Sequence, residues 1–239
     1  MSILMSESDP KFSRPQIVLT RTLKRPNAYT LALDGEFAAH AFNEERGPTY
    51  KGKWRQEVFA KSTDAIVDLE IGTGNGVHFQ YRCVSHPQRH LVGLELKYKP
   101  LIQTIRGALR RGAGNGRVVR YHAFNIDLMF EENEINDIFI HFPDPWTSPR
   151  KPKNRILNPR MLDLFFRLQR PGSKLDFKTD SREAYLWSME NVRKSKYQIE
   201  FETMDLHNTE MAKDNVITQF ERIFMRQNVP INLVRLRKP

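Results

Sequence analysis

The feature that most constrains the fold is a series of short apolar segments that alternate with helical stretches from residue 64 onward. Continuous rather than alternating apolar character is typical of strands buried on both faces of a parallel sheet. The predicted strands lie at 65–70, 91–95, 117–121, 137–142 and 173–178. The predicted helices between and after them lie at 75–84, 97–111, 155–169 and 181–194. This alternation predicts a doubly wound α/β domain with a mostly parallel sheet.

The two ends of the chain differ from this pattern. Segments 197–204 and 217–226 are rich in Ile, Phe and Thr, and we predict that they form an antiparallel strand pair at the sheet edge. Residues 1–30 are polar and punctuated by proline, which is typical of an arm, and 31–60 indicate irregular helix. We therefore expect an N-terminal arm with short helices over 1–60 and one main domain over 61–239.

Composition excludes several classes of protein. The 15 Phe, 7 Tyr and 3 Trp argue against a disordered chain. No strictly apolar run is longer than three residues, so the sequence predicts neither a membrane span nor a secretion signal, and we expect a cytoplasmic protein. A single cysteine, Cys83, excludes a disulfide scaffold, and the seven histidines lack the spacing of metal ligands. We therefore predict no metal.

The net charge of +10 is concentrated in the C-terminal part of the chain. Residues 142–239 carry 19 basic and 12 acidic side chains, and the 150–174 stretch holds eight basic residues against Asp163 alone. Such a block attracts polyphosphate, and nucleic acid is the usual partner of a protein with a pI near 9.8. A solvated helix face that maintains solubility is the alternative.

In doubly wound sheets, ligands bind at the carboxyl ends of the strands, which makes the first of these ends informative. It carries Glu70 followed by glycines at 72, 74 and 76. Glycines allow a sharp turn and a close approach of a ligand to the backbone. Val77 breaks the G-x-G-x-x-G dinucleotide pattern, and the acid at Glu70 disfavours a pyrophosphate but suits a cationic ligand.

Acidic side chains follow three further strands. Glu95 stands where nucleotide-binding sheets hold a ribose diol, and Asp127 comes after the third strand. Asp144 lies between two prolines and is followed closely by Trp146, so the turn is stiff. An acidic pocket inside a basic protein suits S-adenosylmethionine, because its sulfonium and ammonium groups are cationic and it has no phosphate.

These motifs resemble those of the bacterial tRNA (guanine-N7-)-methyltransferases over roughly residues 60–239. The matching elements are Leu69-Glu70-Ile71-Gly72, Gly93-Leu94-Glu95, Asn125-Ile126-Asp127, Phe142-Pro143-Asp144-Pro145-Trp146, Arg155-Ile156-Leu157, Thr179-Asp180 and Thr218-Gln219-Phe220-Glu221-Arg222. The resemblance implies a Rossmann-like class I methyltransferase fold. It also implies transfer of a methyl group from S-adenosyl-L-methionine to N7 of the variable-loop guanine, position 46, of tRNA.

The resemblance also implies roles for individual residues. Asp144 would be the active-site acid. The cofactor would be held by Glu70, Gly72, Gly74, Gly76, Glu95, Asp127 and Asp144. The target guanine would be bound by Asp180, Thr218, Gln219, Phe220, Glu221 and the position of Ser148. RNA would contact Arg150, Lys151, Lys153 and Arg155. The family usually has a lysine where this chain has Ser148, so Arg150 or Lys151 is expected to supply that charge.

Three other functions compete with this interpretation. An NAD oxidoreductase would share the sheet and Glu95 but needs the missing glycine spacing. An amino-group methyltransferase would methylate an exocyclic amine and uses an Asn/Asp-Pro-Pro-aromatic tetrad, whereas this chain has Pro-Asp-Pro-Trp. A non-catalytic RNA-binding protein would explain the charge but not four acids at strand ends. The oligomeric state is left open.

Overall fold

The computed structural model describes residues 13–146 and 154–239, and within them one eight-stranded sheet with the order β1-β4-β3-β2-β5-β6-β8-β7. The strands are β1 (Ala41–Phe42), β2 (Val67–Ile71), β3 (His90–Leu94), β4 (Gly116–Val119), β5 (Ile138–His141), β6 (Lys174–Thr179), β7 (Gln198–Thr203) and β8 (Asn232–Arg237). The pairs from β1 to β6 are parallel, whereas β8 runs antiparallel to both β6 and β7. The predicted doubly wound sheet with an antiparallel C-terminal pair is confirmed.

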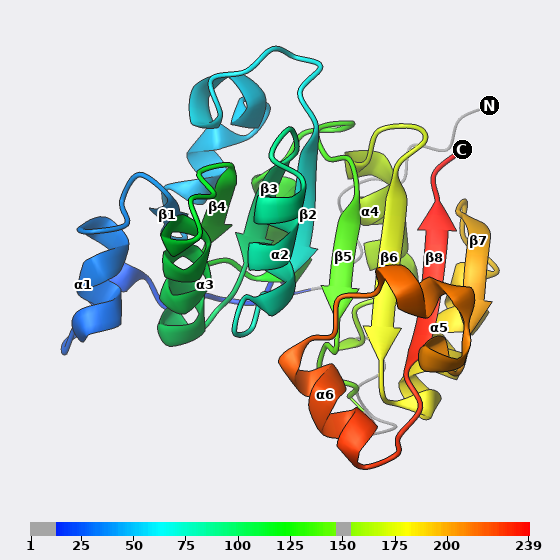
Figure 1. Cartoon of the computed structure of the whole chain (residues 1–239). Helices are drawn as coiled ribbons and strands as arrows, with labels where there is room; N and C mark the ends of the chain where they lie inside the picture. The colour runs from blue at the N-terminus through cyan, green and yellow to red at the C-terminus, as the bar shows by residue number, and fades with distance from the viewer. Residues whose placement is uncertain (1–12, 147–153) are drawn as a thin grey trace, which may run out of the picture.

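Helices cover both faces of this sheet, and Figure 1 shows α2 and α3 in front of the strands and α4 behind them. The helices are α1 (Ala28–Asp34), α2 (Val77–Ser85), α3 (Tyr98–Arg110), α4 (Pro159–Leu168), α5 (Arg182–Val192) and α6 (Gln219–Arg226). Strands β2 and β3 are buried at every position, as their continuous apolar sequences predict. The central core therefore supports the carboxyl ends of these strands on both sides.

The prediction of a strand over 217–226 was wrong, because most of this segment forms α6. Thr218 caps the helix by accepting a hydrogen bond from the Glu221 backbone, and the Glu221 side chain accepts one from Thr218 in return. This reciprocal capping fixes a helix start. The strand that pairs with β7 is instead β8, at the end of the chain, and the sequence reasoning missed it.

The N-terminal region packs onto the sheet rather than standing apart from it. Strand β1 pairs with β4, and Trp54, in a single π-helical turn over Trp54–Val58, is fully buried in the main core. Residues upstream of α1 cross the carboxyl edge, where Arg120 donates a hydrogen bond to the backbone oxygen of Val18 over 2.9 Å. The part of the predicted arm that the structure describes is therefore tied to the domain at several points.

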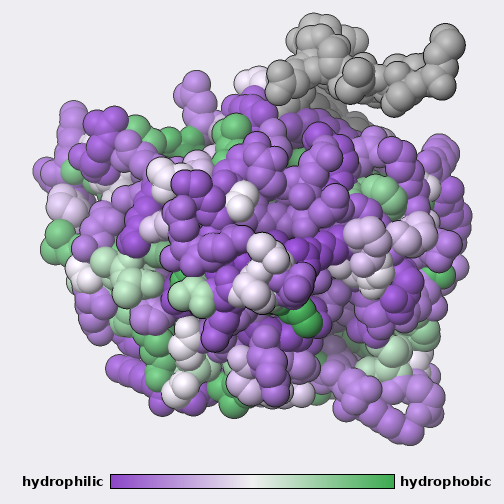
Figure 2. Space-filling view, turned by 90° about the horizontal axis from the view of Figure 1, so that it is seen from above, coloured by the Kyte–Doolittle hydropathy of each residue, from purple (hydrophilic) through white to green (hydrophobic). Residues whose placement is uncertain are grey.

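The sheet has two contrasting edges. The parallel strands point downward in Figure 1, whereas β8 points upward, so the carboxyl edge of the parallel strands lies at the bottom, together with α6. The opposite edge, seen from above in Figure 2, is mostly hydrophilic with scattered apolar side chains. None of the described helices has the length and apolar character that crossing a bilayer requires.

Candidate active site

A cavity of about 880 Å³ opens at the carboxyl ends of β2, β3 and β5. Its size is within the range of small-molecule and cofactor sites. The wall consists of the loop after β2, the ends of β3 and β4, the turn after β5 and the start of α6. Ser13 and Pro15 of the N-terminal segment also line the cavity, as do Asn154 and Ile156 before α4. The rule that ligands bind at the carboxyl ends of parallel strands therefore located the cavity from sequence.

The three glycines of the loop after β2 have two different structural roles. All three have positive φ angles, 77° at Gly72, 51° at Gly74 and 76° at Gly76. A Cβ added at Gly72 or Gly74 would meet nothing within 4 Å, so the backbone there is open to a ligand. At Gly76 it would lie 2.6 Å from Thr104 Oγ1, so this glycine permits close packing of α2 on α3.

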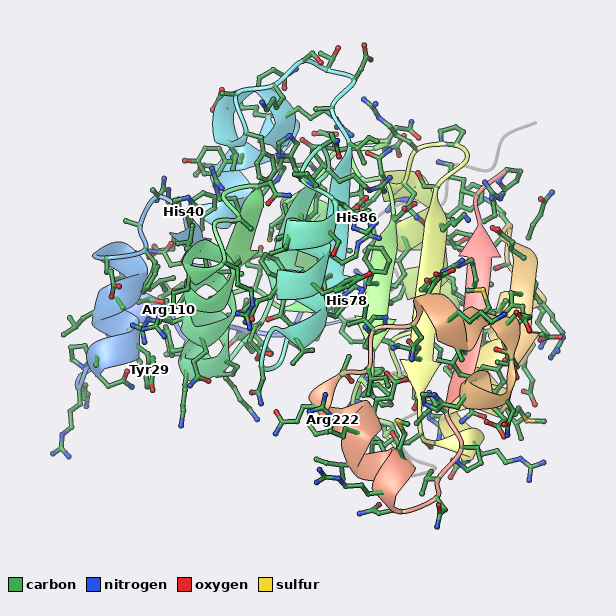
Figure 3. The ribbon with its side chains drawn as sticks, viewed as in Figure 1. Tyr29, His40, His78, His86, Arg110 and Arg222 are labelled. Atoms are coloured by element: carbon green, nitrogen blue, oxygen red, sulfur yellow. The ribbon has the colours of Figure 1, made fainter. Side chains whose placement is uncertain are left out.

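Glu70, the last residue but one of β2, is only 3% exposed yet lines the cavity. Its Oε2 lies 2.8 Å from Nδ1 of His78, on the first turn of α2. Figure 3 shows His78 on the side of α2 that faces β5. Oε1 makes no hydrogen bond within the described residues, and a carboxylate that is half satisfied favours a donor entering the cavity. Sequence reasoning found Glu70 and missed His78.

His78 also contacts a second histidine, His141, which ends β5 and lines the cavity. The ring centroids are 4.4 Å apart, edge to face. Burial, and then the nearby charge of Lys178, hold the pKa of His141 well below its ordinary value, so its ring is neutral. The two rings and Phe139 form a packed layer behind Glu70. His141 is therefore a neutral packing residue at the end of β5.

Glu95 follows β3 and links the glycine loop to the start of α3. Its Oε2 accepts a hydrogen bond from the Gly74 backbone over 3.1 Å, and its Oε1 accepts one from the Lys97 backbone over 2.9 Å. The carboxylate is half-buried and lines the cavity, as the sequence predicts. These bonds fix its orientation beside the loop.

Asp127 has a neighbour that the sequence did not predict. Arg14 donates two hydrogen bonds to its carboxylate, over 2.8 and 2.6 Å. Burial alone would raise the pKa of Asp127, but the hydrogen bonds and charge of Arg14 outweigh it and lower this pKa. Beside it, Asn125 donates a hydrogen bond to the Pro15 oxygen over 2.9 Å. Asp127 itself does not line the cavity; it anchors the N-terminal segment at the cavity edge.

The Pro-Asp-Pro-Trp turn after β5 has a strained backbone. Phe142 and Trp146 have backbone φ angles of 51° and 44°, which residues other than glycine rarely adopt. Such residues cluster at functional sites, where surrounding structure holds them in place. Asp144 between them is exposed, lines the cavity and has no hydrogen-bond or ion-pair partner among the described residues.

Arg155 supports this turn from below. Its Nε donates to the Trp146 oxygen over 3.1 Å, and its Nη2 pairs with Glu183 over 2.5 Å. The guanidinium carbon lies 5.1 Å from the centre of the Trp187 ring. Because Arg155 is only 6% exposed, its burial contradicts the prediction that it contacts RNA directly. The other predicted RNA contacts, Arg150, Lys151 and Lys153, and the position of Ser148 lie outside the described residues.

The predicted guanine-binding residues do not all meet. Thr218, Gln219 and Phe220 line the cavity, and Phe220 is 55% exposed. Glu221 is fully buried behind them, where it accepts a hydrogen bond from Lys178 over 2.8 Å. Asp180, after β6, is half-buried and lies outside the cavity lining, and burial raises its pKa.

Within residues 13–146 and 154–239, no three His, Cys, Asp or Glu side chains are grouped so that they could hold a metal ion. The cavity therefore offers carboxylates, open glycine backbone and aromatic side chains as its recognition groups.

Comparisons with known proteins identify relatives of this site. A family model described as "Putative methyltransferase" matches residues 64–233. The tRNA (guanine-N(7)-)-methyltransferase of Bdellovibrio bacteriovorus is 54% identical over 208 residues, which cover 87% of this chain and 100% of the relative. The protein of the same name from Listeria monocytogenes is 31% identical, over 76% of this chain and 83% of its own length.

The fold has relatives among solved structures as well. The crystal structure of the 16S rRNA methyltransferase KamB superposes with a TM-score of 0.55 at 16% identity, over 76% of this chain and 93% of that chain. At this identity the likeness concerns the fold alone, and it confirms the predicted Rossmann-like class I methyltransferase architecture. The family model and the 54% identical relative both match this chain over most of its length. This chain therefore belongs to the tRNA (guanine-N(7)-)-methyltransferase family.

Proposed function

We propose that this protein transfers the methyl group of S-adenosyl-L-methionine to N7 of the variable-loop guanine, position 46, of tRNA in the cytoplasm. The observation that carries the proposal is Asp144, an exposed carboxylate without a partner among the described residues, in the middle of a strained turn that lines the cavity. The family membership supports the reaction class. We also propose that residues 61–239 form the methyltransferase domain and residues 1–60 an arm with short helices.

The residues around the glycine loop fit the cofactor. Gly72 and Gly74 expose backbone to the cavity, and Glu70 has an unused oxygen for an ammonium group. Glu95 stands where a ribose diol is held in related sheets. When bound there, S-adenosylmethionine supplies an electrophilic methyl group on a sulfonium. Asp127 belongs to the proposed cofactor side through the segment that it anchors.

The chemistry asks little more of the protein than alignment. Guanine N7 has an in-plane lone pair and no proton at neutral pH, so its attack needs no general base. Holding two reactants in line contributes about 7–11 kcal/mol. The base becomes cationic as the bond forms, and an unpaired carboxylate such as Asp144 stabilises that charge. Trp146 and Phe220 offer stacking faces, worth about 1–3 kcal/mol per base.

The target guanine must leave its place in the folded RNA. N7 lies on the major-groove edge, which side chains cannot read in an A-form helix. The base is therefore splayed into the cavity, at the energetic cost of unstacking. Thr218 and Gln219 at the start of α6 provide polar groups for its edge. Asp180 and Glu221 do not line the cavity, and we propose that they support the guanine-binding residues that do.

Nucleoside analysis tests the proposal directly. The protein is incubated with labelled S-adenosylmethionine and bulk tRNA that lacks the modification, and the digested RNA is analysed. We expect 7-methylguanosine, and we expect it to disappear when the tRNA carries adenosine at position 46. Label on an exocyclic amine would indicate an amino-group methyltransferase, and label that persists in the substituted tRNA would refute the assigned position.

A further inference from the structure

Helix α6 is held to the domain by very few of its side chains. Glu221 makes the buried ion pair with Lys178, and Phe224 stacks on Phe142 with ring centroids 5.8 Å apart. At the start of the helix, Gln219 accepts a hydrogen bond from Asn75 of the glycine loop. The helix thus lies at the carboxyl edge of the sheet, at the bottom of Figure 1, with most of its surface in solvent.

The exposed side of α6 combines cationic and apolar groups. Arg222 and Arg226 are both exposed and make no ion pair with the residues that the structure describes. Four residues apart on a helix, they lie on one face about 6 Å from each other along the axis. Phe220 and Ile223, 55% and 39% exposed, lie beside them. Figure 3 shows Arg222 projecting from α6 at the lower edge of the molecule.

Two other arginines, which lie at the strands, do have partners. Arg235 donates two hydrogen bonds to Asp176, and Arg120 pairs with Glu44. These contacts hold strands and loops together inside the domain. Arg222 and Arg226 have no such task, and a helix that only kept the protein soluble would not place large apolar side chains next to them.

We propose that the exposed face of α6, made by Phe220, Arg222, Ile223 and Arg226, is a docking surface for the phosphate backbone of tRNA next to the target guanine. The inference rests on the proposed function. Unpaired arginines match phosphate charge, and the apolar side chains suit unstacked bases. The surface adjoins the cavity because Phe220 belongs to both, and its neighbours Thr218 and Gln219 also line the cavity. The bond from Asn75 to Gln219 links this surface to the glycine loop.

The test compares two double variants that remove equal charge from opposite edges of the sheet. Arg222→Ala with Arg226→Ala changes the proposed surface. Lys61→Ala with Lys194→Ala is the control, since these lysines are exposed, unpaired within the described residues and located before the starts of β2 and β7. Binding of unmodified tRNA is measured at several salt concentrations, without cofactor, so the readout does not depend on methyl transfer.

We expect the α6 variant to bind tRNA at least about tenfold more weakly and to flatten the plot of log Kd against log salt by roughly 1.5–2. The control should change neither quantity by more than about half as much. An unchanged salt slope in the α6 variant, or an equal loss in the control, would overturn the proposal. A change in oligomeric state, measured by light scattering, would also overturn it in favour of a protein contact. Failure of the wild-type protein to form 7-methylguanosine would refute the proposed function instead.

Discussion

The acidic side chains on the two walls of the cavity differ in whether the protein hydrogen-bonds to them. On the wall formed by β2 and β3, protein donors hold both carboxylates: His78 holds Glu70, and two backbone amides hold Glu95. On the wall formed by the turn after β5, Asp144 is exposed and no described residue donates to it. The protein therefore fixes one pair of acids in advance and leaves the third available.

This difference matches what the two reactants need. A cofactor carries its positive charge before it binds, so pre-oriented carboxylates recognise it at no further cost of reorganisation. A guanine acquires positive charge only while N7 is methylated, so an acid with free lone pairs responds to it during the reaction. Under the proposed function, the wall of β2 and β3 would bind the methyl donor, and the wall of the turn after β5 would stabilise the methyl acceptor. Four sets of substitutions would break or sharpen this comparison.

The largest effect is expected at Glu221, which does not line the cavity but is fully buried behind Thr218, Gln219 and Phe220. Burial lowers the pKa of Lys178, while the charge and the hydrogen bond of Glu221 oppose that shift. Glu221→Ala should lower the free energy of unfolding by about 3–5 kcal/mol, because it leaves a buried ammonium unpaired. Urea denaturation measures this loss. A combined Lys178→Met, Glu221→Leu variant should regain most of it, and a single-variant loss below about 1 kcal/mol would contradict the role.

Asp144 should give the next largest effect, and on rate rather than stability. Asp144→Ala should reduce kcat for methyl transfer by about 10²–10³-fold, since an electrostatic stabiliser of the transition state is removed. Its exposure means that the melting temperature should stay the same. Single-turnover kinetics with saturating tRNA and cofactor measures the rate. Full turnover in this variant, or in Asp144→Asn, would show that the available acid is not used.

His78 tests the opposite wall. His78→Phe keeps an aromatic ring but removes the donor to Glu70, which should weaken cofactor binding by about 1–3 kcal/mol through loss of orientation. His78→Asn can still donate from a nearby position and should restore much of the affinity. Isothermal titration with S-adenosylmethionine gives both values. Equal affinity in the Phe variant and the wild type would mean that the hydrogen bond from His78 to Glu70 does not contribute to cofactor binding.

The sequence predicted the parallel strands β2 to β6 well because each is a short and largely buried apolar run. It failed at 217–226 because Ile217, Phe220 and Ile223 also fit a strand when only composition is read. The decisive signal was local: Thr218 and Glu221 form a capping box, which predicts a helix start. Strand β8 was missed because its partners, β6 and β7, are set by long-range pairing that no short window contains.

The site shows the same division. The strand-end rule found Glu70, Glu95 and Asp144, because topology alone brings carboxyl ends together. It could not find His78, whose use depends on how α2 packs against β5, or Arg14, whose partner is 113 residues away in the chain. It also misjudged Arg155, because a basic sequence block does not reveal which of its side chains is buried.

The smallest expected effect concerns Arg14 and Asp127, whose ion pair holds the N-terminal segment at the edge of the cavity. A double-mutant cycle with Arg14→Met and Asp127→Asn should give a coupling free energy of at most about 1 kcal/mol at pH 7, since both groups are partly exposed. The pKa of Asp127 is lowered in the folded state, so the unfolded chain binds its proton first and the coupling is lost as pH falls below about 4. Urea denaturation of the four proteins at pH 7 and at several pH values from about 4 down to about 2 measures this change, because the coupling is fully lost only below the lowered pKa. Because the cycle cancels the titration of all other groups, a coupling that persists in acid would show that the contact is not an ion pair.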